Sequence, residues 1–258
     1  MTQTALENPL SDADLSQYER TGWVVRRGFF DAEDAAAIAR WTDEVTAMPE
    51  LPGRQMVYYE PSLVAPDARV IQRIENFCPY HESFDALVRR SRLTRAANAL
   101  LGAPSCLFKE KINYKMAGGA GFEPHQDQQA GWSRYAPIFV TALVCIDRAT
   151  VANGCLEMPT VRRLKQMIGA EWRPLTRDEM ASFELVPVET EPGDVIFFDS
   201  YVPHSSQPNL TSDARRILYL SYNRLSDGDH RLQYFAEKRA NFPPDIERAP
   251  GKDYKFRV

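Results

Sequence analysis

Residues 191–204, EPGDVIFFDSYVPH, contain a turn, a buried strand and a histidine in direct succession. Proline next to glycine is typical of a tight turn, and the β-branched and aromatic run VIFF is typical of a strand buried on both faces. Comparable strands are predicted along the chain at residues 105–116, 138–146, 185–188, 195–199 and 217–223. Breaks containing glycine, proline and asparagine separate these strands. Such a series predicts a core built as a β-sandwich or barrel.

The part of the chain before these strands is predicted to be mainly helical. Ser11 and Asp31 are each followed by acidic residues, as helix N-caps commonly are. Apolar residues at helical spacing predict one helix that ends near Gly22 and two more over residues 32–47 and 81–101. A short strand is predicted at residues 23–26.

Helices that lead into a run of strands indicate an α+β fold with a mainly β core. No internal repeat or low-complexity tract divides the sequence, so residues 1–258 are predicted to form a single domain. The tail from Arg239 is rich in proline and polar residues, and it is predicted to wrap the surface.

Composition narrows the class of protein. The chain has 31 Lys and Arg against 35 Asp and Glu, a net charge of −4, whereas nucleic-acid-binding domains normally have a basic surplus. No apolar run approaches the roughly 20 residues that span a bilayer, and the N-terminus does not resemble a secretory signal. The cysteines have no C-x-x-C spacing. We expect a cytoplasmic protein whose partner is a small molecule, without nucleic acid or membrane; the sequence leaves the oligomeric state open.

Residues 121–127, GFEPHQD, contain a histidine and an aspartate two positions apart. In an extended chain His125 and Asp127 point to the same side, so their side chains converge. His204 follows the buried strand at residues 195–199. Two histidines and one carboxylate on one face of a metal are the ligands of non-heme Fe(II) oxygenases, which leave positions open for a cosubstrate and O₂. An isolated His-x-Asp is more often structural, so further features must support this interpretation.

Three further features accompany these residues. Arg215 enters the apolar strand ILYLSY, where a guanidinium is costly unless it meets an anion such as a carboxylate. Arg216 is the better candidate for a surface arginine at a strand start. The turn EPGD at residues 191–194 leads into the strand before His204, and the stretch AGGAG at residues 117–121 permits a close backbone approach before His125.

Together, HQD at 125–127, PGDVIFF at 192–198, His204, Arg215 and the opening YERTGWVVRRGFF at 18–30 resemble the phytanoyl-CoA dioxygenase family. The resemblance covers nearly the whole chain. It implies a double-stranded β-helix, or jelly roll, flanked by N-terminal helices, and an oxygenase that uses Fe(II), 2-oxoglutarate and O₂ to hydroxylate its substrate. It also implies that His125, Asp127 and His204 are the iron ligands and catalytic centre, and that Arg215 binds the distal carboxylate of 2-oxoglutarate. An aspartate rather than a small residue at position 127 disfavours halogenation.

The strand LFKEKINYK at residues 107–115 carries candidate binding residues. Alternation places Lys109, Lys111, Asn113 and Lys115 on one side. Lys111 and Asn113 are predicted to grip an anion or the cosubstrate, whereas Lys109 and Lys115 are equally compatible with a solvated edge. Substrate contacts are expected from residues near the metal loop and from an upstream tyrosine, namely Gln126, Trp132, Arg134 and Tyr58.

The stretches KEKINYK, GFEPHQD, AGW and RIENF also resemble a bacterial branch of the family that hydroxylates small aminophosphonates such as 2-aminoethylphosphonate. Such a substrate needs a cation for the phosphonate, for which Lys111, Arg134 and Arg162 are candidates. It also needs an aromatic or acidic contact for the amine, from among Tyr58, Tyr59, Trp132 and Tyr201. Two alternatives are the same chemistry on an acyl-CoA or secondary metabolite, and a non-catalytic metal-binding jelly roll.

Overall fold

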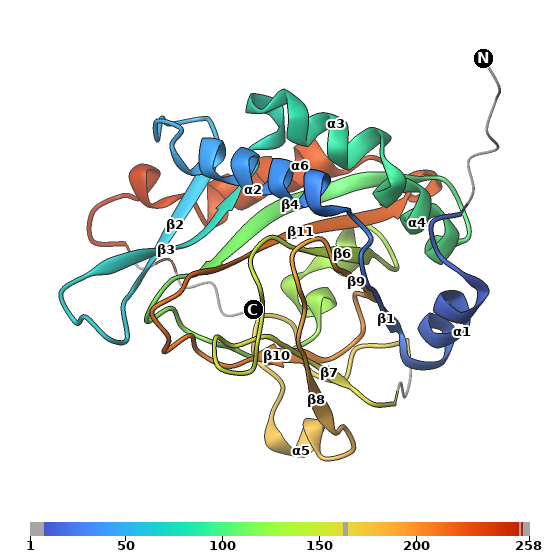
Figure 1. The fold of residues 1–258 in the computed structure, drawn as a ribbon. Helices are drawn as coiled ribbons and strands as arrows, with labels where there is room; N and C mark the ends of the chain where they lie inside the picture. Colours follow the sequence, from blue (N-terminus) through green and yellow to red (C-terminus); the bar gives the residue numbers. More distant parts are fainter. Residues whose placement is uncertain (1–7, 162–164, 253, 255–258) are drawn as a thin grey trace.

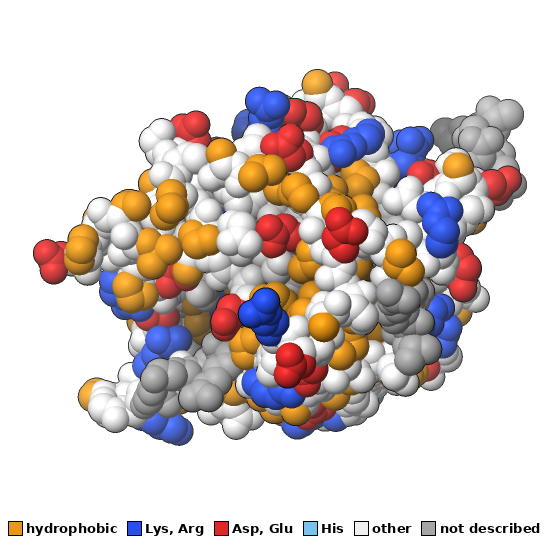
Figure 2. All heavy atoms as spheres, turned by 90° about the horizontal axis from the view of Figure 1, so that it is seen from below, with side chains coloured by type: hydrophobic (Ala, Val, Ile, Leu, Met, Phe, Trp, Pro, Cys, Tyr) orange, Lys and Arg blue, Asp and Glu red, His pale blue; other side chains and the backbone are white. Residues whose placement is uncertain are grey.

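A computed structural model of the chain describes residues 8–161, 165–252 and 254. It has the predicted α+β architecture, in which helices cover the outer face of the larger of two antiparallel sheets (Figure 1). No helix in the described part is long and apolar enough to cross a membrane. The face shown in Figure 2 carries acidic and basic side chains interspersed, in keeping with the near balance of charges in the sequence.

The larger sheet has seven strands in the order β1-β9-β6-β11-β4-β3-β2. Their bounds are Trp23–Arg26 (β1), Met56–Pro61 (β2), Arg69–Glu75 (β3), Ser105–Lys115 (β4), Val140–Cys145 (β6), Val195–Asp199 (β9) and Arg215–Arg224 (β11). The smaller sheet has the order β5-β10-β7-β8, with strands Phe122–His125 (β5), Leu156–Pro159 (β7), Leu185–Val188 (β8) and His204–Ser206 (β10). From β4 to β11 the chain therefore crosses repeatedly between the two sheets.

The helices are Asp12–Thr21 (α1), Ala32–Thr46 (α2), Glu82–Arg90 (α3), Arg92–Leu101 (α4), Arg177–Met180 (α5) and Arg231–Asn241 (α6). Ser11 and Asp31 cap α1 and α2 as predicted, since each side chain accepts a hydrogen bond from the backbone three residues on. The apolar faces of α2, α3 and α4 pack on the outer face of the seven-stranded sheet. A second apolar cluster, which includes Leu143, Ile196 and Phe198, fills the space between the sheets.

Four details differ from the sequence-based expectations. The helix predicted over 81–101 is two helices, because Ser91 adopts an extended conformation and its side chain caps α4. Strands β2 and β3 lie in a region predicted to be helical or loop, and they extend the sheet beyond β4. The short strands β5, β7 and β10 were not predicted as separate elements, since few residues define each of them. The tail begins with α6, which runs past Arg239 and packs on β4.

Strand β4 determines which side chains enter the space between the sheets. Its odd-numbered residues Lys109, Lys111 and Asn113 lie opposite Ser221, Tyr219 and Ile217 of β11. The even-numbered Ile112 and Tyr114 instead join the core beneath the helices. The predicted common side for the lysines and Asn113 is confirmed. The solvated-edge alternative is wrong, because Lys109 and Lys115 are only 5% and 1% exposed.

Candidate active site

His125 and His204 of the smaller sheet come together with Asp127, whose carboxylate contacts Thr141 of β6 in the larger sheet. Candidate ligand atoms of these three side chains all lie within 4.8 Å of one another. His125 ends β5, and the extended backbone continues through Gln126 to Asp127, the first residue of the 3₁₀ helix Asp127–Ala130. His204 begins β10 and is paired directly with His125. The arrangement predicted from His-x-Asp and the late histidine is therefore present.

The two imidazoles are oriented by the same device. Nδ1 of His125 lies 2.7 Å from the Glu123 carbonyl oxygen, and Nδ1 of His204 lies 2.9 Å from the Val202 carbonyl oxygen. Each carbonyl can only accept, so each Nδ1 carries the hydrogen and donates it. The Nε2 atoms are then unprotonated lone-pair donors, which is the form that binds a metal ion.

The electrostatics of the three residues agree with that form. Burial, and for His125 also the neighbouring His204, lowers the pKa of both imidazoles, so both are neutral at pH 7. Although burial alone would raise the pKa of Asp127, the nearby His204 and Lys111 hold it below its usual range. Thr141 Oγ1 donates a hydrogen bond of 3.3 Å to the carboxylate. Two neutral imidazoles and one ionised carboxylate fit a ferrous ion chemically.

Arg215 is held inside the molecule at the start of β11. It is 1% exposed, and its Nε and Nη1 have no hydrogen-bond partner within the described residues. Tyr219 is four residues further along β11, on the same face as Arg215. It interacts with both Arg215 and Asn113. The side-chain oxygen of Asn113 is likewise buried without a partner. Buried donors without partners are costly, and a bidentate carboxylate would satisfy this guanidinium.

Lys111 lies between this region and the three metal-binding candidates. Its Nζ lies 4.7 Å from the centre of the Tyr219 ring. Burial, with the neighbouring Lys109 next, lowers the pKa of Lys111 to about 8. Lys109 reaches toward aromatic groups instead, with its Nζ 5.3 Å from the ring centres of both Trp132 and Tyr234. Neither ammonium has a hydrogen bond or ion pair with a carboxylate of the described chain.

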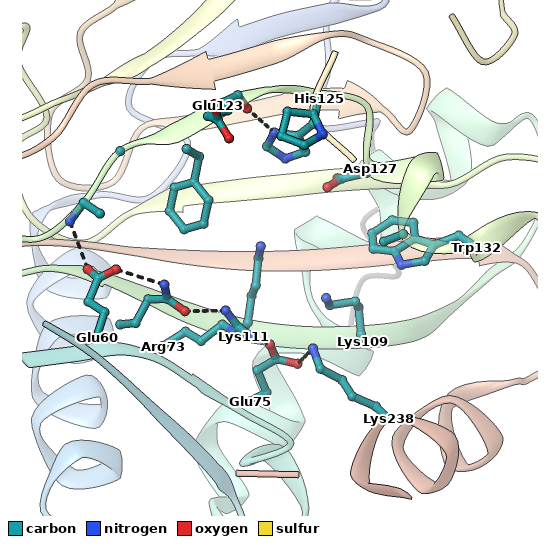
Figure 3. Close-up of a pocket in the computed structure, with 16 residues that line it drawn as sticks. Glu60, Arg73, Glu75, Lys109, Lys111, Glu123, His125, Asp127, Trp132 and Lys238 are labelled. Atoms are coloured by element: carbon teal, nitrogen blue, oxygen red, sulfur yellow. Dashed lines mark hydrogen bonds and ion pairs between the residues drawn. The ribbon is translucent and has the colours of Figure 1, made fainter. Parts of the chain in front are cut away.

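A cavity of about 370 Å³ opens beside these residues. Its lining includes His125, Asp127, Trp132, Lys109 and Lys111 (Figure 3). The lining also includes residues from β2, β3 and α6 to which the sequence analysis gave no role in the site, although Arg73 and Glu75 belong to RIENF: Glu60, Gln72, Arg73, Glu75 and Lys238. The alternation of charged residues in QRIE, at residues 72–75, was the available signal for these positions. Only the pairing of β3 with β4 shows that the face with Arg73 and Glu75 is interior.

Several predicted substrate contacts lie elsewhere. Gln126 is fully buried, where its amide nitrogen donates to the carbonyls of Gln166 and Tyr201 and its oxygen accepts from the Ile168 N–H. Arg134 is exposed beside Glu237, and it lines a separate surface cavity. Only Trp132 of the four predicted contacts lines the cavity beside the histidines.

The tyrosines proposed for an amine do not line this cavity either. Tyr58 is buried and donates its hydroxyl hydrogen to the Phe242 carbonyl, and Arg73 stacks on its ring. Tyr59 and Tyr201 are hydrogen bonded to Glu50 and to the Pro137 carbonyl. Arg162 lies outside the described residues.

Comparison with known proteins identifies the family. The model of the phytanoyl-CoA dioxygenase (PhyH) family matches residues 18–217, which is most of the chain. The chain belongs to the phytanoyl-CoA dioxygenase family. As a member of this family, it is a dioxygenase that uses iron and 2-oxoglutarate.

Two curated relatives of this family member share more than 30% of their residues with it. A 2-aminoethylphosphonate dioxygenase of Uncultured bacterium HF130_AEPn_1 is 38% identical over 93% of this chain and 91% of its own. A methylphosphonate hydroxylase of Gimesia maris is 33% identical over 97% of this chain and 95% of its own.

Solved structures support the same fold for this family member. The crystal structure of EctD from S. alaskensis with 2-oxoglutarate and 5-hydroxyectoine has a TM-score of 0.71 and 21% identity. The match covers 88% of this chain and 80% of that one. The epimerase SnoN from nogalamycin biosynthesis has a TM-score of 0.66 and 21% identity over 83% of this chain and 82% of its own.

Proposed function

We propose that this dioxygenase hydroxylates a small aminoalkylphosphonate similar to 2-aminoethylphosphonate. The observation that carries the proposal is the pair Lys109, which is buried, and Lys111, which is half-buried. Both face the cavity beside His125 and Asp127, and neither forms a hydrogen bond or ion pair with a carboxylate in the described chain. A dianionic phosphonate supplies the missing negative charge. The names of the two relatives above 30% identity support the same substrate class.

We assign the metal to His125, Asp127 and His204. Their convergent lone pairs and the neutral state of both imidazoles support this role. When bound, the iron supplies oxidation chemistry in which 2-oxoglutarate and O₂ give succinate, carbon dioxide and a hydroxylated substrate. The protein holds both imidazoles in one tautomer through the carbonyls of Glu123 and Val202.

We assign the distal carboxylate of 2-oxoglutarate to Arg215. The unpartnered Nε and Nη1 of Arg215 support bidentate binding, and Tyr219 and Asn113 lie beside it to complete the contact. Lys111, between Arg215 and Asp127, is placed to contact the cosubstrate as well.

We assign the phosphonate to Lys109. This side chain stands on the cavity wall next to Trp132, away from Arg215 along the same strand pair (Figure 3). The indole and the Tyr234 ring hold the ammonium in place. The largely charged lining of the cavity favours a small charged substrate over an acyl chain.

We further propose that strands β4–β11 form one double-stranded β-helix domain. The repeated crossing between the sheets, with β9-β6-β11-β4 within one sheet and β5-β10-β7-β8 in the other, supports this topology.

Two measurements test the function. Anaerobic enzyme with Fe(II) and 2-oxoglutarate should show a metal-to-ligand charge-transfer band in the visible region. In air, 2-aminoethylphosphonate should increase succinate formation above the uncoupled rate and yield one hydroxylated product per succinate. A charge-transfer band without stimulation by any phosphonate would contradict the substrate and leave the cofactors standing, whereas absence of the band would contradict the metal assignment.

A further inference from the structure

Glu60 of β2 lies at the end of the cavity remote from Trp132 (Figure 3). Its side chain is buried, with the residue 8% exposed. Oε1 accepts a hydrogen bond of 3.0 Å from the Ala120 N–H, and Oε2 accepts one of 2.9 Å from the Gln72 amide. No cation of the described residues forms an ion pair with this carboxylate. Each oxygen keeps accepting capacity, because an ionised carboxylate has about four lone-pair sites.

The other acid on the cavity floor is neutralised. Glu75 accepts from Arg73 Nε at 2.7 Å through Oε1 and from Lys238 Nζ at 2.5 Å through Oε2. A chain of hydrogen bonds runs along the floor from Glu60 through Gln72 and Arg73 to Glu75 and Lys238 (Figure 3). Within this chain Glu60 is joined only to a neutral amide, and no cation of the described residues forms an ion pair with it.

The cavity therefore has opposite charges on different parts of its lining. Among the described residues, neither Lys109 nor Lys111 of β4 forms an ion pair with a carboxylate, and Glu60 forms none with a cation. Burying either charge alone costs free energy, and a ligand that carries both opposite charges recovers the cost at both places. A zwitterion has this property, whereas a simple alkylphosphonate satisfies only the lysines of β4.

We propose that Glu60 binds the ammonium group of the substrate and thereby selects aminoalkylphosphonates over alkylphosphonates that lack an amine. This inference rests on the proposed function, since it takes the phosphonate to be held by the lysines of β4 that line the cavity, Lys109 and Lys111. The ammonium donates to the free lone pairs of Glu60, while the Gln72 amide and the Ala120 N–H hold the carboxylate in position. Glu60 is then a specificity-determining residue remote from the metal.

The test measures affinity, so that it does not depend on turnover. Calorimetry on anaerobic enzyme loaded with Fe(II) and 2-oxoglutarate would compare 2-aminoethylphosphonate with n-propylphosphonate, in which a methyl group replaces the ammonium. The wild type should bind 2-aminoethylphosphonate more tightly. Glu60→Gln should weaken its binding by roughly tenfold to a hundredfold, as expected for loss of a charge-assisted hydrogen bond, and leave propylphosphonate binding unchanged.

Two further variants separate recognition from structure. Glu60→Asp keeps the charge but shortens the side chain, so it should retain part of the preference. Asp67→Asn removes an exposed negative charge from the same hairpin and should change neither affinity. Equal loss of both ligands in Glu60→Gln would show that Glu60 only anchors the loop at Ala120, and the inference would be wrong.

The wild type alone distinguishes the two proposals. If it binds the two phosphonates equally, Glu60 does not select the amine, although the phosphonate proposal stands. If it binds neither phosphonate, the proposed function fails and this inference fails with it.

Discussion

His204 lies directly opposite His125 in the pairing of β10 with β5, and their ring centres are 4.4 Å apart. Residues on a strand alternate between faces, so a register slip of one residue would turn one imidazole away from the other. Gly121 helps to fix this register: a Cβ at that position would lie 2.5 Å from the Ser206 carbonyl oxygen, so only glycine permits the approach of the chain before β5 to the end of β10. The AGGAG stretch thus brings the chain close to β10 rather than to the metal position.

Replacing any one of His125, Asp127 and His204 with alanine is predicted to abolish iron binding and turnover, because each variant leaves only two side chains to hold the ion. Metal analysis after anaerobic loading with Fe(II), together with the charge-transfer band, checks the prediction. His230→Gln is the control, since His230 lies at the start of α6, where its Nε2 hydrogen bonds to the Asp227 carbonyl. Full iron content in His204→Ala would contradict the assignment.

Arg215→Met is predicted to keep iron and to raise the dissociation constant for 2-oxoglutarate by roughly tenfold to a hundredfold, the loss expected for charge-assisted hydrogen bonds. Titration of the charge-transfer band with 2-oxoglutarate measures this constant. Arg216→Lys provides the matched control on the adjacent residue, whose side chain pairs with Asp147 and Asp43 instead. Unchanged cosubstrate affinity in Arg215→Met would refute the role of Arg215.

Glu75→Gln is predicted to lower the free energy of unfolding by about 3–5 kcal/mol, because it leaves Arg73 and Lys238 without their shared buried carboxylate. Denaturation in urea measures the change. Adding Lys238→Met should recover part of the loss, since it removes one of the two cations that lose this carboxylate. Asp85→Asn, which breaks an exposed pair with Arg89, should cost less than about 1 kcal/mol. Equal effects of Glu75→Gln and Asp85→Asn would disprove the argument.

Lys115 is predicted to make the stability of the fold rise with pH. Burial, and next the adjacent Arg215, lowers the pKa of Lys115 to about 6 from its usual value of 10.5. Between these pH values the unfolded chain binds the extra proton, so this residue adds up to about 1.4 kcal/mol of stability for each pH unit gained. The Nζ of Lys115 donates to the Gly154 and Gln207 carbonyls and to the Ser206 Oγ, and a neutral amine still has two hydrogens for the two carbonyls.

Urea denaturation between pH 6.5 and 9 tests this prediction in the wild type and in Lys115→Met. Lys115→Met should lack this contribution. The free energy of unfolding of the wild type, relative to that of the variant, should therefore rise steadily with pH. Parallel curves would mean that Lys115 stays protonated in the folded protein.

The parts of the fold and site that were predictable depend on local sequence. Caps such as Ser11 and Asp31, the apolar strands, and the pair His125 and Asp127 two residues apart all carry their signal within a few residues. The large apolar run at 195–199 was assigned with the bounds that β9 has. The single helix over 81–101 failed because the extended backbone at Ser91 does not interrupt the apolar pattern.

The remaining site residues depend on contacts between distant segments. Glu60, Arg73 and Glu75 become part of the cavity only because β3 pairs with β4, and Lys238 only because α6 packs on the same strand. Arg134 was expected at the substrate because it follows the metal loop, but the 3₁₀ helix Trp132–Arg134 buries Trp132 and turns Arg134 to solvent. Loop residues change direction within one turn, so proximity in sequence does not fix which side of the chain they occupy.

Helix α6 gives the order of synthesis a physical consequence. Lys238, which pairs with Glu75, leaves the ribosome 163 residues after it. Until then Glu75 has Arg73 as a partner, but Lys238, the second cation that pairs with it, has not yet been synthesised. We therefore expect the floor of the cavity to settle only once α6 has been synthesised and packs on β4.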